Sequence, residues 1–347
     1  MPSPTHPIHI IGLGSIGSFI AHSLRSLPKP PPVHLLIHRK SLYDEFASKG
    51  WNLGLRVSEE GTLQEQGGFD AELLSESASS EPIHNLIVAV KASATIAALK
   101  PIQHRLGPQS TICLFQNGLG QIEDLNERIF TDQAARPTYM VGIMRHGVYL
   151  RSPTEAILSG LNGRAAIGVV DAADQRPRQS NPQFLLDTLL RSPILRCEQL
   201  EWKDLLHNQL LKLAANCVLN PLTAILNVRN GVIKENPDLQ PLIQRLLEEI
   251  SLVFQNLPEL KDLPSDQKDH FSVGSLQTVV MDTIEKTAGN SSSMREDVRK
   301  GRATEIEYIN GWILRRGKEL GIECDANAGL TQLVLAKSRL GMDPYSS

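Results

Sequence analysis

A lysine and two asparagines recur at intervals of four residues in one strongly apolar stretch. They are Lys212, Asn216 and Asn220. In a helix, four residues correspond to about 400° of rotation, so the three side chains form a stripe on one face. Polar groups within a buried helix need partners or a ligand site. A protonated lysine there could stabilise charge on a carbonyl oxygen and supply a proton. The alternative is a solvated stripe on an amphipathic helix.

Pro221 follows this stripe directly. Proline has no backbone N–H, and its ring presses on the preceding turn. The sequence therefore predicts a bend in the helix and a carbonyl near Cys217 that lacks its helical donor.

A second polar segment lies near the C-terminus. Thr304 and Glu307 have the spacing of a capping box, which predicts that a helix begins there and ends at Gly321. Glu305 would then lie in the first turn, where a carboxylate could serve a site or only complement the helix dipole. The preceding Ser291–Ser293 could be a simple loop.

A glycine motif follows the first apolar run of the chain. Gly12, Gly14 and Gly17 form G-x-G-x-x-G after residues 8–12 and before a helical pattern. In this context the first glycine permits a tight turn, the second admits a pyrophosphate, and the third allows close packing. The motif predicts a dinucleotide site, and the alternative is a glycine turn without a ligand.

The end of the next strand indicates which dinucleotide binds. An NAD enzyme usually carries an acidic residue there, but this strand ends in Ile37-His38-Arg39-Lys40. Cations at this position suit a 2′-phosphate, and the guanidinium of Arg39 can bind two phosphate oxygens. The sequence therefore predicts NADPH as the cofactor, against the alternative of a solvated basic turn.

Strands and helices alternate through the first half of the chain. Apolar runs predict strands at 8–12, 33–37, 85–90 and 111–115, with helices at 15–27 and 93–104 between them. We expect residues 50–82 to form surface hairpins or loops, 139–170 antiparallel strands, and 171–182 a loop. From about 200 the pattern is almost entirely helical. The chain is thus predicted to be α/β, with an N-terminal Rossmann-type doubly wound sheet and an all-helical C-terminal domain.

Composition excludes several classes of protein. The 347 residues are 41% hydrophobic and 21% charged, and the net charge of −3 gives no basic field for nucleic acid or anionic membranes. The four cysteines are far apart, with neither metal spacing nor a disulfide framework. No apolar run suggests a membrane span, and the N-terminus has no signal or mitochondrial presequence pattern. We expect a cytoplasmic protein without a bound metal, although a mitochondrial location is not excluded.

Five blocks of sequence resemble the ketopantoate reductase family. The resemblance runs from about residue 8 to residue 335, and the blocks are IIGLGSIG, VAVKASAT, QNGLG, KLAANCVLNPLTAILNVRNG (212–231) and SSMREDVRKGRATEIEYINGWILRRG (292–317). The last two are long enough to be specific. One stretch departs from the family: Arg145 stands where a Thr-His-Gly-like pattern is common, which adds a cation that could alter substrate preference.

The resemblance implies a reaction and a set of roles. The reaction is the NADPH-dependent reduction of 2-dehydropantoate (ketopantoate) to (R)-pantoate, a step of pantothenate biosynthesis. Residues 1–200 would bind NADPH, and 201–347 would hold the substrate and the catalytic residues. Lys212 would donate the proton to the keto oxygen, and Glu305 would hold the substrate hydroxyl. Substrate-binding positions would be Asn216, Asn220, Asn290 and Ser293; cofactor-binding positions would be Gly12, Leu13, Gly14, Ser15, Ile16, Gly17, Arg39, Lys40, Lys91 and Asn117.

Two alternative functions stay open at this point, together with the state of assembly. The first is a related 2-keto-acid or opine-type reductase, and the second is a catalytically silent relative that binds NADPH. The presence of both Lys212 and Glu305 argues against the silent relative. A small-molecule substrate is expected, and a homodimer is compatible with the sequence.

Overall fold

The computed structural model describes residues 6–171 and 179–340. Within them the chain forms two compact units. The N-terminal unit contains the residues up to Gln116 together with Gln121–Leu205, and the C-terminal unit contains Asn117–Gly120 together with the residues from Leu206 onward. A short segment from the first half of the chain is therefore part of the C-terminal unit.

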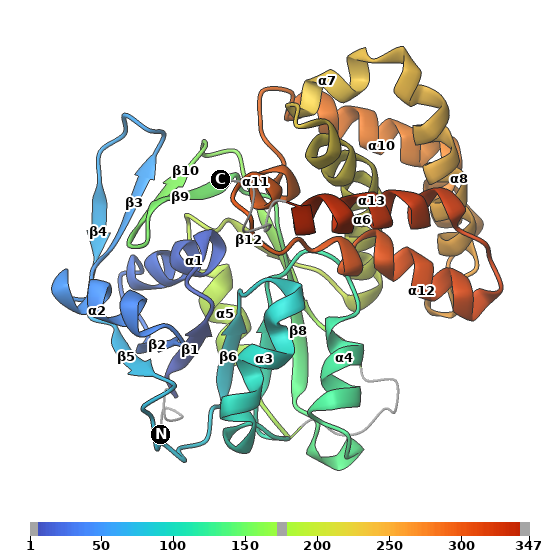
Figure 1. The fold of residues 1–347 in the computed structure, drawn as a ribbon. Helices are drawn as coiled ribbons and strands as arrows, with labels where there is room; N and C mark the ends of the chain where they lie inside the picture. The colour runs from blue at the N-terminus through green and yellow to red at the C-terminus, as the bar shows by residue number, and fades with distance from the viewer. Residues whose placement is uncertain (1–5, 172–178, 341–347) are drawn as a thin grey trace. The chain divides into compact units, whose positions relative to one another are not determined.

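The N-terminal unit is built on an eight-stranded sheet with the order β12-β11-β8-β7-β6-β1-β2-β5 (Figure 1). Its strand pairs are parallel, except that β11 runs antiparallel to β8. The strands are β1 (Ile8–Ile11), β2 (Val33–Ile37), β5 (Asp70–Leu73), β6 (Asn85–Val88), β7 (Thr111–Leu114), β8 (Thr138–Met144), β11 (Ala165–Val169) and β12 (Cys197–Gln199). This arrangement confirms the predicted Rossmann-type sheet.

Both faces of this sheet are buried, which explains why its strands are continuous apolar runs. Ile10 of β1 belongs to a hydrophobic core on one face, and its neighbour Ile11 belongs to a second core. The helices of the unit supply the covering side chains of these cores. They are α1 (Ser15–Arg25), α2 (Lys40–Ser48), α3 (Thr95–Leu99), α4 (Gln121–Arg128) and α5 (Gln183–Leu190).

A second, four-stranded sheet packs on α1, with the order β4-β3-β10-β9. It contains β3 (Leu53–Val57), β4 (Gln64–Gln66), β9 (Val148–Ser152) and β10 (Glu155–Leu158). One prediction needs correction here. The 50–82 segment is more than loops and hairpins, because β5 joins the main sheet beside β2. Strand β5 is short and lies at the edge of the sheet, so only its last residue is buried and its sequence shows little alternation of apolar and polar residues. The antiparallel strands expected in 139–170 are confirmed, since β8 pairs with β11 and β9 pairs with β10 in that way, while β8 is also parallel to β7.

The described part of the C-terminal unit is helical, which confirms the second half of the predicted fold class. The helices α12 and α13 lie side by side in Figure 1. The elements are α6 (Trp202–Leu226), α7 (Asn230–Glu235), α8 (Gln240–Gln255), α9 (Ser265–Lys268), α10 (Val273–Lys286), α11 (Ser293–Arg299), α12 (Asn310–Leu320) and α13 (Asp325–Leu340).

Helix α6 runs through Pro221 without a break. Its length and apolar composition would also suffice to cross a membrane, contrary to the sequence-based expectation. However, 67% of its most apolar window is buried inside the protein. Core helices of globular proteins share this combination, so the finding does not indicate a membrane protein.

One local prediction was wrong and one lies mostly outside the described residues. The helical stretch expected at 93–104 is confirmed, with 3₁₀ helix on both sides of α3. The Thr304 capping box does not form. Glu305 precedes a 3₁₀ turn at Ile306–Tyr308, and α12 begins only at Asn310, so Glu305 is not in the first turn of that helix. Gly321 ends α12 in the left-handed conformation, as predicted. The predicted 171–182 loop includes 172–178, which are not described.

Candidate active site

In the glycine loop between β1 and α1, two of the three motif glycines are required by close packing, and the third leaves open space. Gly12 has φ +98°, and a Cβ there would lie 2.4 Å from the backbone nitrogen of Val90. A Cβ on Gly17 would lie 2.0 Å from the Gly12 oxygen, whereas one on Gly14 would meet nothing within 4 Å. Gly14 is also the N-cap of α1 and has no side chain to cap it. The first-turn N–H groups of α1 are therefore open to an anion.

The basic residues that follow β2 differ in how they are held. Lys40 donates a hydrogen bond to Asp44 at 3.2 Å and lies 3.9 Å from Glu76. Arg39 is exposed, and no residue that the structure describes forms a hydrogen bond or ion pair with its guanidinium. Arg39 is therefore the cation of the two that is better placed to receive a phosphate.

Lys91 follows β6, the strand next to β1 in the sheet. The backbone N–H of Ala89 donates to Ile11 at 2.9 Å, which fixes this strand end against the glycine loop. Gln116 also donates to the Val90 carbonyl at 2.9 Å. Since β2, β1 and β6 are parallel, their carboxyl ends share one edge of the sheet, where doubly wound folds bind ligands. That edge carries the glycine loop with Leu13, Ser15 and Ile16, the basic pair, and Lys91. Arg145 is exposed just after β8.

In the C-terminal unit, Asn117 bridges a lysine and a carboxylate. The Lys212 Nζ donates to Asn117 Oδ1 at 3.0 Å, and Asn117 Nδ2 donates to Glu305 Oε2 at 3.4 Å. An ammonium only donates and a carboxylate only accepts, so the orientation of the Asn117 amide is determined. Glu305 is only 4% exposed. An ammonium held in this way can donate to an oxygen bound beside it.

The short segment that carries Asn117 is fixed to the residues before α12. Leu119 donates its N–H to the Tyr308 carbonyl at 2.9 Å. Gly118 has φ +79°, and a Cβ there would lie 2.3 Å from the same oxygen. The close approach of the two backbones explains why a glycine follows Asn117.

The stripe predicted on α6 is present, and the carbonyl predicted to lack a helical donor has found another. Asn216 is half-buried and Asn220 is buried. The Cys217 carbonyl accepts a hydrogen bond from Asn310 Nδ2 at 2.9 Å. Burial raises the pKa of the Cys217 thiol well above its usual range, so this residue is a packing group and not a nucleophile.

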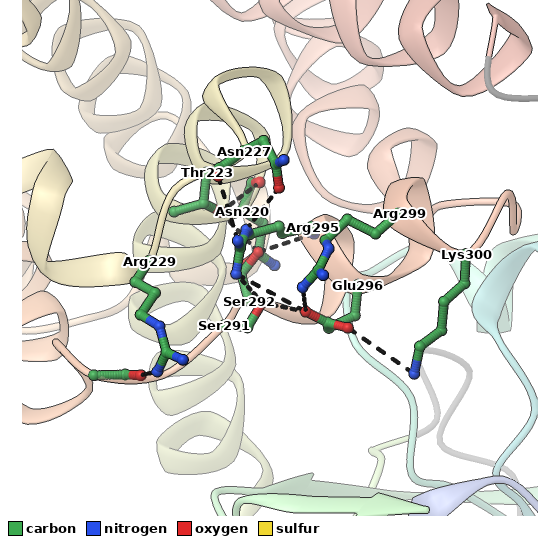
Figure 2. Close-up of polar contacts among 11 residues, drawn as sticks. Asn220, Thr223, Asn227, Arg229, Ser291, Ser292, Arg295, Glu296, Arg299 and Lys300 are labelled. Carbon is green, nitrogen blue, oxygen red and sulfur yellow. Dashed lines mark hydrogen bonds and ion pairs between the residues drawn. The ribbon is translucent and has the colours of Figure 1, made fainter.

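Asn290 and Ser293 are both exposed, and they flank a loop that is tied to α6. The Ser292 and Thr223 hydroxyls lie 2.7 Å apart, and Thr223 also donates to the Asn220 carbonyl at 3.0 Å. The Asn290 carbonyl accepts the N–H of Asn230 at 3.1 Å. Figure 2 shows Thr223 and Ser292 joined in this way. The loop is therefore positioned by the same helix that carries Lys212.

A basic cluster borders this loop (Figure 2). Arg295 donates from Nε to Asn227 Oδ1 at 3.0 Å and from Nη1 to Ser291 Oγ at 2.9 Å. The Ser291 hydroxyl in turn holds the pKa of Glu296 below its usual value, assisted by Arg299 and Lys300 and opposed by burial. Because Arg295 is occupied by these partners, it acts as a clamp on the loop. Arg229 adds a further hydrogen bond to the Gly289 carbonyl.

Sequence reasoning missed three polar residues of the C-terminal unit: Asn310, Thr223 and Arg295. Each lies inside or beside a motif that was recognised, but none has a spacing that marks it. Asn310 offered the best signal, because a polar amide follows three apolar positions of the TEIEYING block.

Metal and thiol chemistry have no obvious location in the described ranges. Among residues 6–171 and 179–340, no group of three or more His, Cys, Asp or Glu side chains could hold a metal ion. All four cysteines fall in these ranges and are free thiols.

Comparison with known proteins agrees with this architecture. The family model described as "Ketopantoate reductase PanE/ApbA" matches residues 8–172, and its C-terminal counterpart matches residues 204–338. A Schizosaccharomyces pombe protein named "Probable 2-dehydropantoate 2-reductase" is 31% identical over 97% of both chains. A Gibberella fujikuroi protein named "Ketoisovalerate reductase BEA2" is 26% identical over 94% of this chain and 82% of its own.

Solved structures share the fold. A D-mandelate dehydrogenase in complex with NADH and anilino(oxo)acetate superposes with a TM-score of 0.77. That comparison covers 97% of this chain and 99% of the other at 20% identity. From the two family models and the full-length relative it follows that the chain belongs to the ketopantoate reductase family of oxidoreductases.

Proposed function

We propose that this protein is an NADPH-dependent 2-dehydropantoate 2-reductase, which forms (R)-pantoate for pantothenate biosynthesis. The observation that carries the proposal is the Lys212–Asn117–Glu305 arrangement in a member of this family. The N-terminal residues to about 200 would bind the cofactor, and those from 201 onward, with Asn117, would hold the substrate and the catalytic side chains.

The glycine loop and the basic residue after β2 support NADPH as cofactor. Gly14 leaves space for a pyrophosphate at the start of α1, and the exposed guanidinium of Arg39 suits a 2′-phosphate. Lys40 and Lys91 add positive charge at the same sheet edge. When bound, NADPH would supply a hydride to the keto carbon of the substrate.

Lys212 would complete the reduction at oxygen. Hydride addition to C2 leaves negative charge on the keto oxygen, and a protonated lysine stabilises that charge and then transfers its proton. The product is an alcohol, so one hydride and one proton are consumed for each carbonyl reduced. The hydrogen bond to Asn117 would limit the positions of the ammonium and aim it during this step.

Neutral groups would orient the substrate around this lysine. Asn216 and Asn220 lie on the same face of α6, and Asn290 and Ser293 flank the loop tied to that helix. Amides and hydroxyls can bind a carboxylate without a second strong charge beside Lys212. The buried Glu305 carboxylate would accept a hydrogen bond from the substrate hydroxyl, a group that keto acids such as ketoisovalerate lack.

A second candidate function is the reduction of a keto acid without that hydroxyl. It is favoured by the full-length similarity to a relative named as a ketoisovalerate reductase. The buried Glu305 weighs against it, because in that complex the carboxylate would face an apolar group and would receive no hydrogen bond from the substrate. A silent NADPH-binding relative is disfavoured by the intact Lys212–Asn117 pair.

The deciding experiment follows NADPH oxidation by purified protein with 2-dehydropantoate and, separately, with ketoisovalerate. A kcat/KM for 2-dehydropantoate at least about 10²-fold higher would support the first function, as expected of a site that pairs a substrate hydroxyl. The reverse preference would support the second candidate, and no turnover with either would contradict both.

Location and assembly are also proposals. We infer a cytoplasmic enzyme, and a homodimer is the assembly that we would test first. Light scattering of the purified protein would measure the mass, and imaging of a tagged chain would locate it.

A further inference from the structure

Asn310 is a fully buried asparagine at the first position of α12, with an exposed fraction of 0%. Both hydrogens of its amide nitrogen are used. One is donated to the Cys217 carbonyl of α6 at 2.9 Å and the other to Asn327 Oδ1 of α13 at 3.0 Å. Its own Oδ1 has no partner among the described residues. The position therefore requires the amide N–H groups and makes no use of the carbonyl.

The orientation of this amide is set by groups that can only accept. Asn327 donates from Nδ2 to the Glu249 carboxylate at 2.7 Å, so its Oδ1 must face Asn310. Glu249 also accepts the backbone N–H groups of Ala326 at 2.8 Å and Asn327 at 3.0 Å. A hydrogen-bond chain thus runs from Cys217 through two asparagines to a carboxylate of α8. Rotating either amide would place two acceptors together.

The chain ends at the one carbonyl of α6 that proline deprives of its helical donor. In an uninterrupted helix, the N–H of residue 221 would donate to the carbonyl of residue 217. Pro221 has no N–H, so Asn310 supplies the donor from another helix. Cys217 lies between Lys212 and Asn220, one residue after Asn216. The replaced hydrogen bond therefore lies within the segment that carries the stripe.

We propose that Asn310 is a positioning residue for the reductase site, which fixes the section of α6 that carries Lys212, Asn216 and Asn220. The inference rests on the proposed function, since it assigns these residues to substrate and proton transfer. Displacements of about 1 Å at such groups can reduce a rate by about 10²-fold. Asn310 does not itself touch the reacting atoms, because it lies on the side of α6 that faces α12 and α13.

The test is a rescue experiment. Asn310→Leu keeps the size of the side chain and removes both donors, and we expect kcat to fall by about 10- to 100-fold. NADPH affinity, measured by fluorescence titration, should stay within about two-fold of wild type, because the glycine loop belongs to the N-terminal unit. Pro221→Ala returns an N–H to position 221, which can donate to Cys217. In the Pro221→Ala background, Asn310→Leu should therefore lower kcat by less than about three-fold.

Ser251→Ala is the matched control. Its hydroxyl is buried in α8 and donates to the Phe271 carbonyl at 2.7 Å, and the hydrogen-bond partners of this hydroxyl, Phe271 and Gln255, lie outside α6. Loss of that hydrogen bond should lower the melting temperature and leave kcat unchanged. A similar melting temperature for Ser251→Ala and Asn310→Leu, with kcat lost only in the latter, would separate positioning from general stability.

Two outcomes would overturn the proposal. One is an Asn310→Leu protein that is folded and turns over within two-fold of wild type. The other is a loss that is equally large with and without Pro221→Ala, because the restored N–H would then have no effect. If Asn310→Leu alone does not fold, the proposal requires that the Asn310→Leu/Pro221→Ala double variant folds. Failure of both variants to fold would count against the proposal.

The failure of the proposed function would look different. Wild-type protein would then reduce neither keto acid. The melting temperatures of wild type, Asn310→Leu, Pro221→Ala and the double variant would still show whether positions 310 and 221 are coupled. Asn310→Leu should destabilise the wild-type background more than the Pro221→Ala background, since a buried carbonyl is left without a donor only in the former.

Discussion

Lys212 and Asn117 are 95 positions apart in sequence, yet the lysine Nζ lies 3.0 Å from the asparagine Oδ1. The lysine comes from the long helix of the C-terminal unit, and the asparagine comes from the four-residue segment inserted into it. The pair fixes an ammonium group beside a buried carboxylate. Much of the proposed chemistry depends on that single contact.

Removing the ammonium should abolish most of the chemistry and spare cofactor binding. We expect Lys212→Ala to slow single-turnover hydride transfer by about 10²- to 10⁴-fold, the usual scale for a positioned acid. Lys212→Arg should not restore it fully, because a guanidinium does not release its proton. The control is Lys203→Ala, an exposed lysine of the same helix. A folded Lys212→Ala protein with a rate near wild type would assign the proton to another donor, with Lys91 the next candidate.

Glu305 should determine recognition of the substrate hydroxyl. In Glu305→Ala, the preference for 2-dehydropantoate over a keto acid lacking the hydroxyl should fall by about 10²-fold or more in kcat/KM. Glu307→Ala, an exposed acid two residues later, should keep the preference. Unchanged discrimination in Glu305→Ala would mean that the carboxylate serves only to hold Asn117.

Substitutions of the first two glycines of the glycine loop should have different effects. A methyl group at Gly14 meets open space, so Gly14→Ala should fold normally and lose NADPH affinity by about 10-fold or more, because the methyl would occupy the position of the phosphates. Gly12→Ala would require an unfavourable positive φ and a 2.4 Å contact, so it should fold poorly. Thermal melting and fluorescence titration distinguish the two, and equal defects in both properties would argue against a pyrophosphate at Gly14.

Arg39 should distinguish NADPH from NADH. We expect Arg39→Ala to raise the KM for NADPH by about 10-fold, the scale of one charge-assisted contact, and to leave that for NADH little changed. Lys40→Ala should have a smaller effect, because Lys40 is already paired with Asp44. A parallel loss for both cofactors would remove the 2′-phosphate role.

A buried histidine should make the protein less stable in acid. Burial, and then the nearby His34 and Arg105, lower the pKa of His9 from 6.5 to about 4. Below pH 6.5 the unfolded chain binds a proton that the folded chain excludes, so the free energy of unfolding falls as pH decreases toward 4. Between pH 7.5 and pH 5 this contribution is about 2 kcal/mol.

Urea unfolding at those two pH values isolates the effect. His9→Leu should show a pH dependence that is smaller than that of wild type by about 2 kcal/mol. Ile11→Val, a core change in the same strand without a titratable group, should be destabilised to the same extent at both values. Identical pH dependence in wild type and His9→Leu would exclude His9 as the source.

Periodicity and turn chemistry predicted the parts of the fold that depend on local sequence. The strand at 33–37 and the end of α12 at Gly321 follow directly from an apolar run and from a glycine that tolerates positive φ. The prediction failed where tertiary contacts override local preference. Thr304 and Glu307 have capping-box spacing, but Tyr308 instead offers its carbonyl to Leu119, and the helix begins later.

The candidate site was predictable only in part. The stripe on α6 follows from helical geometry, and Pro221 correctly indicated a carbonyl without its helical donor. The role of Asn310 could not be deduced, because its two acceptors lie 93 and 17 residues away. Such pairings are set by how helices pack, which single-sequence spacing does not encode.

Because the segment Asn117–Gly120 belongs to the C-terminal unit, recombination cannot separate the two units with a single cut in the chain. The contacts of this segment place it in the C-terminal unit, although more than 80 residues of sequence separate it from Leu206, where the rest of that unit begins. A fragment starting at Leu206 would lack Asn117, and Tyr308 would lose the N–H of Leu119. A chimera joined near residue 200 would bring a foreign version of this segment to the lysine. The two halves are therefore expected to be inherited together and not exchanged as independent modules.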